Sequence, residues 1–367
     1  MISRLEDLDL FKGFLEGEEV DRFLEHFNIK FGSGTWVAGD FSDRFMRSGY
    51  NPDLSSDIIS KILRIKKAGV RIFTPVNVEF LDQRLEIRWD LVDEVKRVSR
   101  ENNMVSPALG ADLSGVPLFK LGTLTNPDES LRKRSIEILV ESLDIAKRLD
   151  AKILSLWPGQ DGWDYSLESN YGRKIRLFLE GLRELAYEAV KRDLVLTIEA
   201  KLKEPREGNM IIPTTHAAIL MARRVNDEIG RDVVGLTIDY GHELMYAVEP
   251  AYTVYLAREF NIPIHVIHIN SAKTHSNDED RIVGTGDLWH FIDFLYATID
   301  TGFQGYYILD QFTYRMDPVE SIRLSKEFFA NIMRRVLEIY RRREEFEKIR
   351  SSGDQAKIID FLKRIIL

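Results

Sequence analysis

Residues that commonly bind metal ions are concentrated in residues 234–280. They form three close pairs in the sequence: Asp239 and His242, His268 and Asn270, and Asp278 and Asp280. Imidazole and carboxylate ligands without cysteine suit borderline to hard divalent ions such as Mn²⁺, Co²⁺ or Mg²⁺. The segment therefore predicts a metal site, and the rest of the chain must position it and supply the missing ligands.

The elements that could position this site recur as a short apolar run followed by a longer segment of helical periodicity. The predicted strands cover residues 29–32, 69–73, 105–110, 151–157, 194–199, 234–239, 264–269 and 305–310. The clearest helices are predicted at residues 131–149, 173–191, 215–225, 251–260, 288–298 and 319–341. Eight βα units predict a parallel (β/α)8 TIM barrel. A doubly wound sheet is the alternative, although no early G-x-G-x-x-G motif supports nucleotide binding in it.

Amphipathic segments flank the predicted barrel at both ends. Residues 17–27 carry apolar side chains at helical spacing, and residues 358–366 do the same near the C-terminus. We therefore expect an N-terminal helical extension (1–28), a catalytic barrel (29–336) and a C-terminal helical arm (337–367). The apolar face of the arm predicts packing on a neighbouring subunit, with docking on its own barrel as the alternative.

Composition narrows the function classes. The chain has 367 residues, 44% of them hydrophobic, with no cysteine and a formal charge of −8. Disulfides and thiolate metal sites are excluded, and the acidic balance argues against a large nucleic-acid footprint. No apolar run of about 18 residues and no signal-like start are present, so we expect a cytoplasmic protein that does not enter the membrane.

Strand geometry selects the polar residues that could meet. Side chains alternate across a strand, and barrel active sites lie at the carboxyl ends of the strands. Glu199, Asp239 and Asp310 each end a predicted strand, and His268 lies at the same level on another. These four ligand types are expected to converge at one face of the barrel.

The loops after two of these strands extend the prediction to a second metal site. In Asp239-Tyr-Gly-His242, we expect Gly241 to permit a tight turn that returns the imidazole over the strand end. Asp239 could then bridge two ions. Asp278 and Asp280 alternate along an extended loop, where both carboxylates can bind the second ion.

The residues resemble the metal-dependent aldose–ketose isomerases of the xylose isomerase and L-rhamnose isomerase type over about residues 31–336. The stretches FGSGTWVAGDFSDRF and ILSLWPGQDG are similar to the first and fourth strands of those enzymes. IEAKLKEPREGNMIIPT resembles a segment with a glutamate ligand and a lysine two positions later, here Glu199 and Lys201. Asp239 replaces the glutamate of xylose isomerases, and LDQFTYRMDPVES is also closer to the rhamnose type.

This resemblance implies a complete set of ligands. The first ion would be bound by Glu199, Asp239, His268 and Asp310. The second would be bound by Asp239, His242, Asp278 and Asp280. An alternative alignment with a two-residue deletion places Asn270 in the position of His268.

The resemblance also implies the reaction, in which two divalent ions interconvert an unphosphorylated pentose or hexose with its 2-ketose. Lys201 and Asp310 are the expected catalytic residues, and the residues expected to contact the sugar are Trp36, Phe73, Trp157 and Lys201. Lys201 could instead form an ion pair with Glu199 or Glu204. Two imidazole ligands favour Mn²⁺ or Co²⁺ over Mg²⁺, and related isomerases are tetramers with embracing C-terminal arms.

One departure concerns the second strand, where both families have a histidine that contacts the sugar ring oxygen. This chain has Phe73 in that place, with Asn77 and Glu79 downstream as possible substitutes. The rival functions are a single-metal ketose 3-epimerase, a metallo-endonuclease, which the charge of −8 disfavours, and an inactive binding protein.

Overall fold

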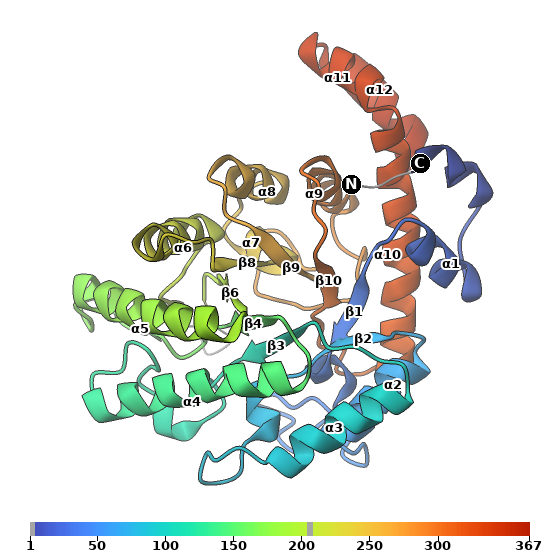
Figure 1. The fold of residues 1–367 in the computed structure, drawn as a ribbon. Helices are drawn as coiled ribbons and strands as arrows, with labels where there is room; N and C mark the ends of the chain where they lie inside the picture. The colour runs from blue at the N-terminus through green and yellow to red at the C-terminus, as the bar shows by residue number, and fades with distance from the viewer. Residues whose placement is uncertain (1–3, 204–207) are drawn as a thin grey trace.

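The computed structural model describes residues 4–203 and 208–367, and its centre is a parallel eight-stranded sheet (Figure 1). The strands follow the order β2-β1-β10-β9-β8-β6-β4-β3. They are β1 (Phe31–Gly34), β2 (Ile72–Thr74), β3 (Ala108–Ala111), β4 (Ile153–Leu156), β6 (Val195–Glu199), β8 (Val234–Asp239), β9 (Ile264–Ile269) and β10 (Tyr306–Leu309). Backbone bonds join the two outer strands, since Phe73 N donates to Val105 O at 3.0 Å and Gly110 N donates to Pro75 O at 2.8 Å. The predicted TIM barrel is confirmed.

Helices cover the outside of this barrel (Figure 1). They are α2 (Ile58–Lys67), α3 (Trp89–Glu101), α4 (Glu129–Arg148), α5 (Tyr171–Arg192), α6 (Thr215–Ile229), α8 (Pro250–Glu259), α9 (Leu288–Asp300) and α10 (Pro318–Arg341). A further short helix, α7 (Tyr240–Met245), begins directly after β8. The loops after β4 and β6 pair as a small antiparallel ladder of β5 (Gly162–Trp163) and β7 (Asn209–Met210). Among the described residues, no helix is long and apolar enough to span a membrane.

Most strands begin one to three residues later than their apolar runs predict, because the first residues of a run end the preceding helix. The backbone N–H of Ile29 donates to Leu24 O at 2.8 Å, and that of Leu194 donates to Ala189 O at 3.0 Å. Such bonds satisfy the free carbonyls of a helix C-terminus, and an apolar residue there packs back on the helix. Apolar periodicity does not separate these residues from the strand that follows.

Side chains fill the barrel interior in layers. The apolar layer contains Ala108, Ile153, Val266 and Ile308. Two residues beyond Ile153, the hydroxyl of Ser155 lies 2.7 Å from that of Thr237 on β8, which lies 2.7 Å from that of Thr197 on β6. Glu199 and Asp239 follow two residues after these threonines, and His268 and Asp310 follow two residues after Val266 and Ile308, so the candidate site stands on a packed floor.

The N-terminal segment packs on α10. The predicted helix at residues 17–27 is confirmed as α1 (Glu18–His26), whose Val20, Phe23 and Leu24 are buried. Asp21 of α1 forms an ion pair of 2.5 Å with the buried Lys326 of α10. The extension is therefore part of the same hydrophobic core as the barrel.

The C-terminal arm continues from α10, which runs unbroken to Arg341, and consists of α11 (Arg343–Ser351) and α12 (Gln355–Ile366). Phe361, Ile365 and Ile366 of α12 are buried against their own chain, and Phe361 stacks on Phe346 with ring centres 5.0 Å apart. Ile359 remains 53% exposed. The arm therefore docks in part on its own barrel, and its contact with a neighbouring subunit stays a prediction.

Candidate metal centre

Four inward-facing side chains meet at the carboxyl ends of β6, β8, β9 and β10. One ligand atom from each of Glu199, Asp239, His268 and Asp310 lies within 4.8 Å of the others. These residues are the four that strand alternation predicts to converge. Three carboxylates and one imidazole are hard to borderline ligands of the kind that Mn²⁺ and Co²⁺ accept.

His268 turns its Nδ1 atom toward this group. That atom lies 3.3 Å from Glu199 Oε1 and 3.2 Å from Asp310 Oδ2. Burial disfavours the imidazolium, but the charge of Glu199 and the hydrogen bond to Asp310 outweigh burial and raise the pKa of His268. A divalent cation would take the place of the proton between these ligands.

Trp36 supports the group from the loop after β1. Its indole Nε1 donates a hydrogen bond of 2.7 Å to Asp310 Oδ1, and its ring centre lies 5.8 Å from that of His268. A Cβ at Gly34 would lie within 2.6 Å of the indole, so glycine is required for Trp36 to reach this position. The sequence predicts Trp36 as a sugar contact but does not predict its bond to Asp310.

A second group consists of Asp239, His242 and Asp278. His242 lies on α7, where its backbone N–H donates to Asp239 Oδ1 at 2.9 Å. The ring Nδ1 is 2.9 Å from Ala200 O, a carbonyl that can only accept, so Nδ1 carries the proton. Nε2, 3.1 Å from Asp278 Oδ2, can then offer its lone pair to a metal ion that displaces its proton.

Gly241 does not form the tight turn that the sequence predicts. It lies inside helix α7 rather than in a left-handed turn. A Cβ there would approach Asn270 Oδ1 at 2.9 Å and Asp278 Oδ1 at 3.0 Å. Glycine is needed because the helix passes close to these two oxygens.

Asp280 reaches the centre through Asn270 and lies outside both ligand groups of the described residues. The amide Nδ2 of Asn270 donates to Asp280 Oδ1 at 3.0 Å and to the two oxygens of Asp239 at 3.1 and 3.2 Å. Burial and the neighbouring carboxylates raise the pKa of Asp280. Asn270, the alternative to His268 in the alignment, thus uses its amide nitrogen to join two carboxylates.

The centre carries more negative than positive charge, a property that fits divalent cations. Burial raises the pKa of Asp239 to about 7, with contributions from Asp278 and Asp310 and an opposing one from His242. Oδ1 of Asp278 is buried and has no hydrogen-bond partner among the described residues. Because buried polar atoms are rarely left unpaired, this oxygen is suited to coordination.

Lys201 lies at the edge of the second group. Its Nζ is 2.8 Å from Asp278 Oδ2 and 5.5 Å from the centre of the Trp157 ring. Of its two predicted alternative partners, Glu204 lies outside the described residues. Lys201 and His242 of the second group therefore contact the same oxygen of Asp278.

Phe73 does not line the site, in contrast to its prediction as a sugar contact. It is fully buried in the main hydrophobic core, whereas its neighbour Ile72 packs against the apolar layer inside the barrel. β2 continues to Thr74, one residue beyond the predicted run, so alternation turns Thr74 inward and Phe73 outward. The hydroxyl of Thr74 is buried without a partner among the described residues.

The two possible substitutes for a strand-two histidine form hydrogen bonds outside the ligand groups. Asn77 donates to Ser142 Oγ at 3.1 Å and accepts from the backbone of Asp112 at 3.0 Å. Glu79 accepts from Thr35 and pairs with Lys61 at 2.9 Å. These contacts give both side chains a role in fixing the loop after β2.

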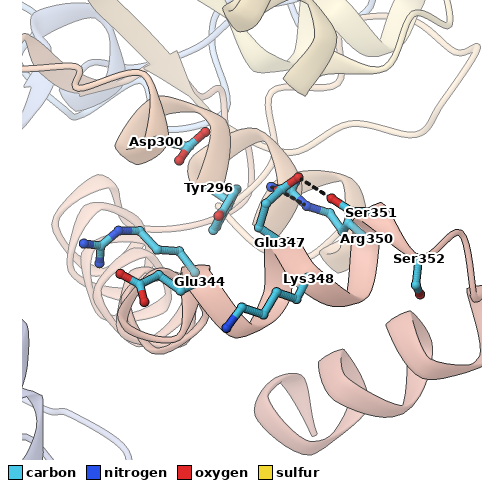
Figure 2. Close-up of a pocket in the computed structure, with 9 residues that line it drawn as sticks. Tyr296, Asp300, Glu344, Glu347, Lys348, Arg350, Ser351 and Ser352 are labelled. Carbon is cyan, nitrogen blue, oxygen red and sulfur yellow. Dashed lines mark hydrogen bonds and ion pairs between the residues drawn. The ribbon is translucent and has the colours of Figure 1, made fainter.

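A groove of about 840 Å³ lies outside the barrel between α9 and α11 (Figure 2). Arg350 and Glu347 pair along its α11 side, and on the α9 side Asp300 accepts a hydrogen bond of 2.8 Å from Tyr255. None of the residues that line it belongs to the two ligand groups. The groove is therefore separate from the candidate metal centre.

Comparison with known proteins identifies the family. Residues 62–332 match the xylose isomerase-like TIM barrel family. The chain belongs to this family. It is 25% identical over 256 residues to a probable sugar isomerase of Rhizobium meliloti, and 25% identical over 259 residues to one of Mesorhizobium japonicum. Each match covers 66% of this chain but only 57% and 56% of the relative, so the chain spans just over half the length of these proteins.

Solved structures with the same fold include an L-ribulose 3-epimerase and a D-tagatose 3-epimerase-like protein. The first superposes with a TM-score of 0.63 at 15% identity and covers 86% of this chain and 97% of its own. The second has a TM-score of 0.63 at 19% identity and covers 84% of this chain and 100% of its own. At 15% and 19% identity, this structural similarity supports the barrel fold of the chain and nothing about its reaction.

Proposed function

We propose that this chain is an aldose–ketose isomerase that uses two divalent metal ions on an unphosphorylated pentose or hexose. The observation that carries the proposal is the pair of ligand groups that share Asp239, with the ammonium of Lys201 bonded to the second group. A single ion would leave one of these groups, including the buried unpaired oxygen of Asp278, without a partner. The match to the xylose isomerase-like family supports the same class of chemistry.

The residues present fit the two ions. Glu199, Asp239, His268 and Asp310 would bind the first ion, and Asp239, His242 and Asp278 would bind the second, with Asp280, here bonded to Asn270, as the expected fourth ligand. Because two ligands are imidazoles, we expect Mn²⁺ or Co²⁺ to serve better than Mg²⁺. When bound, the ions supply positive charge to the sugar oxygens on which negative charge grows as the carbonyl moves between C1 and C2.

The protein side chains supply the remaining functions. Lys201, oriented by its ion pair with Asp278, would donate a hydrogen bond to the C1 oxygen of the sugar. Asp310, whose Oδ1 is held by Trp36, would act as the second catalytic residue. Trp157 and Trp36 would shield the reacting atoms from bulk water, which strengthens electrostatic interactions at the site.

The proposal takes the L-rhamnose isomerase type as its model, on the resemblance of the sequence. Asp239 replaces the glutamate of xylose isomerases, and His268 rather than an aspartate stands in the first ligand group. Phosphate-binding barrels place a glycine-rich anion site after strands seven and eight, whereas this chain has only Gly284 and Gly286 in the first of these loops and no glycine in the second. These features support an unphosphorylated substrate, with a 6-deoxy sugar among the candidates.

A metal-dependent ketose 3-epimerase is the second candidate. Glu199 and Asp310 approach the same nitrogen of His268 from two strands, so the site offers a pair of carboxylates that could exchange a proton with a sugar carbon. Such a reaction requires one ion and gives Asp278 and Asp280 no ligand function.

Incubation of the Mn²⁺-loaded protein with a panel of aldoses and ketoses tests the proposal, together with the metal content per chain. We expect two ions per chain and reversible exchange between an aldose and its 2-ketose. Inversion at C3 with one ion per chain would contradict the isomerase and support the epimerase.

A further inference from the structure

The short helix α7 carries His242 on one side and a buried acidic residue, Glu243, on the other. Glu243 is 0% exposed and lies among α6, α7 and α8, away from the ligand groups. Consecutive helical residues point about 100° apart, so one side chain faces the metal centre and the next faces the surrounding helices. The proposed mechanism gives Glu243 no role.

The Glu243 carboxylate accepts hydrogen bonds from three hydroxyl groups. Thr215 Oγ1, at the start of α6, lies 2.5 Å from one oxygen, and Thr253 Oγ1 of α8 lies 2.6 Å from the other. Tyr246, the residue after α7, also donates to the first oxygen, and its own hydroxyl accepts from the backbone of Thr215 at 3.2 Å. One carboxylate thus ties α7 to both neighbouring helices.

Stability alone does not account for this arrangement. Burial of a carboxylate among neutral hydroxyls is costly, and well-packed apolar side chains often serve a fold as well or better. A helix of only six residues has few backbone bonds of its own. Its orientation therefore depends on its anchors, which include the cap of Asp239 at the N-terminus, the packing of Tyr240 on Phe291 and Phe294, and Glu243 on the outer side.

We propose that Glu243 is a positioning residue that holds α7 so that His242 Nε2 faces the second ligand group. Through this anchor, the imidazole keeps Nδ1 at Ala200 O and Nε2 near Asp278. The inference rests on the proposed function, because it assigns His242 to the second ion. Partners that orient a ligating histidine typically change metal affinity by about 10- to 100-fold.

Calorimetric and spectroscopic titration with Co²⁺ tests this inference without a sugar. For Glu243→Ala, we expect the affinity of the second site to fall by about tenfold or more, with a changed visible absorption of that ion. The first site should stay within about twofold. Glu243→Gln keeps the size and one acceptor, and it should recover most of the affinity.

Thr253→Val, which removes one donor without a change of shape, should act in the same direction if Glu243→Ala does not fold. Asn331→Ala is the matched control, since Asn331 is a buried polar residue that anchors Leu15 to α10. It should lower the melting temperature and leave both Co²⁺ affinities unchanged.

Equal loss at both sites, or lower stability with an unchanged second site, would overturn the inference. A wild-type protein that binds two Co²⁺ ions but isomerises no sugar would contradict the proposed function. The positioning role would survive that result, because its readout is metal binding.

Discussion

Lys201 Nζ lies 2.8 Å from Asp278 Oδ2, and His242 Nε2 lies 3.1 Å from the same oxygen. All three side chains are buried, with no more than 6% exposed. Burial opposes the ionisation of Asp278, but the charges of His242 and Lys201 outweigh burial and lower its pKa. The proposed catalytic lysine is thus joined to the second ligand group through one carboxylate.

Lys201→Met should slow turnover by roughly 100-fold, the usual scale for the loss of one charge-stabilising donor. The variant should still bind two ions, because removal of the ammonium leaves Asp278 free for the second ion. Steady-state kinetics and metal analysis of the same preparation measure the two effects.

Lys326→Met is the matched control for this variant. Lys326 is also a buried lysine with an aspartate partner, Asp21, but it lies between α1 and α10. Its replacement should affect stability and leave turnover unchanged. Normal turnover of Lys201→Met would mean that the mechanism drawn for Lys201 is wrong.

Asp239→Ala should abolish the binding of both ions and all activity, because Asp239 belongs to both ligand groups. Asp239 also accepts the backbone N–H of His242 at the start of α7. Asp239→Asn retains an acceptor for that bond, so it separates loss of the cap from loss of the charged ligand. Elemental analysis after dialysis measures the metal content.

Variants of residues that belong to only one of the two ligand groups provide the comparison for Asp239→Ala. His242→Ala should lose the second ion only, and Asp310→Ala should weaken the first ion only. Retention of two ions by Asp239→Ala would exclude a shared ligand.

Trp36→Phe should weaken binding of the first ion by about tenfold, because it removes the hydrogen bond that orients Asp310. A calorimetric titration with Mn²⁺ measures this change. Trp163→Phe, at a tryptophan that packs on Tyr171 with ring centres 4.8 Å apart, is the control and should bind normally. An unchanged affinity for Trp36→Phe would assign Trp36 to the sugar alone.

Apolar runs and strand alternation predict much of this centre, but they do not predict its contacts between residues that lie far apart in the sequence. β8 and β9 have their predicted bounds, and alternation turns Asp239 and His268 inward. The same rule fails for Phe73. The predicted strand ends at Phe73 but β2 ends at Thr74, and a shift of one residue exchanges the inward and outward side chains of a strand. The bond from Trp36 to Asp310 joins residues 274 positions apart. No local pattern contains such a contact.

The alternatives for His268 show the same limit. Local sequence leaves both His268 and Asn270 as ligands, and only the folded chain shows the amide of Asn270 donating to two carboxylates. An amide nitrogen that donates to Asp239 and Asp280 cannot coordinate a cation at the same time. The carbonyl Oδ1 of Asn270 is buried without a partner among the described residues, so Asn270 stays an alternative ligand beside His268, which belongs to the first ligand group.

Truncation after Arg350 tests the C-terminal arm. We expect a smaller solution mass, because α12 is proposed to contact a neighbouring subunit of a tetramer. A lower melting temperature should accompany it, since Phe346 loses its stack with Phe361. Light scattering and thermal unfolding measure the two effects.

Ile359→Asp separates the two effects of the arm. Ile359 is 53% exposed, so a charge there should disturb contact with another subunit and leave the packing of Phe361 intact. An unchanged mass for both variants would show that the arm docks on its own barrel alone.

The metal affinity should fall as the pH is lowered, because ligands must lose their protons to bind an ion. Burial disfavours the imidazolium of His242, but the charges of Asp239 and Asp278 outweigh it and raise the pKa of His242 to about 10. The pKa of Asp239 is raised to about 7. Below these values protons compete with the ion, so each displaced proton lowers the apparent affinity about tenfold per pH unit.

Mn²⁺ titrations between about pH 8 and pH 6 measure this slope, and buffers of different ionisation enthalpy count the protons released. We expect the second site to release at least one proton per ion, with a steeper slope below about pH 7, where Asp239 also holds a proton. In Asp310→Ala, the slope of this site should persist, because His242 and Asp239 are intact. A second-site affinity that is independent of pH and releases no proton would show that His242 is not a ligand of the ion.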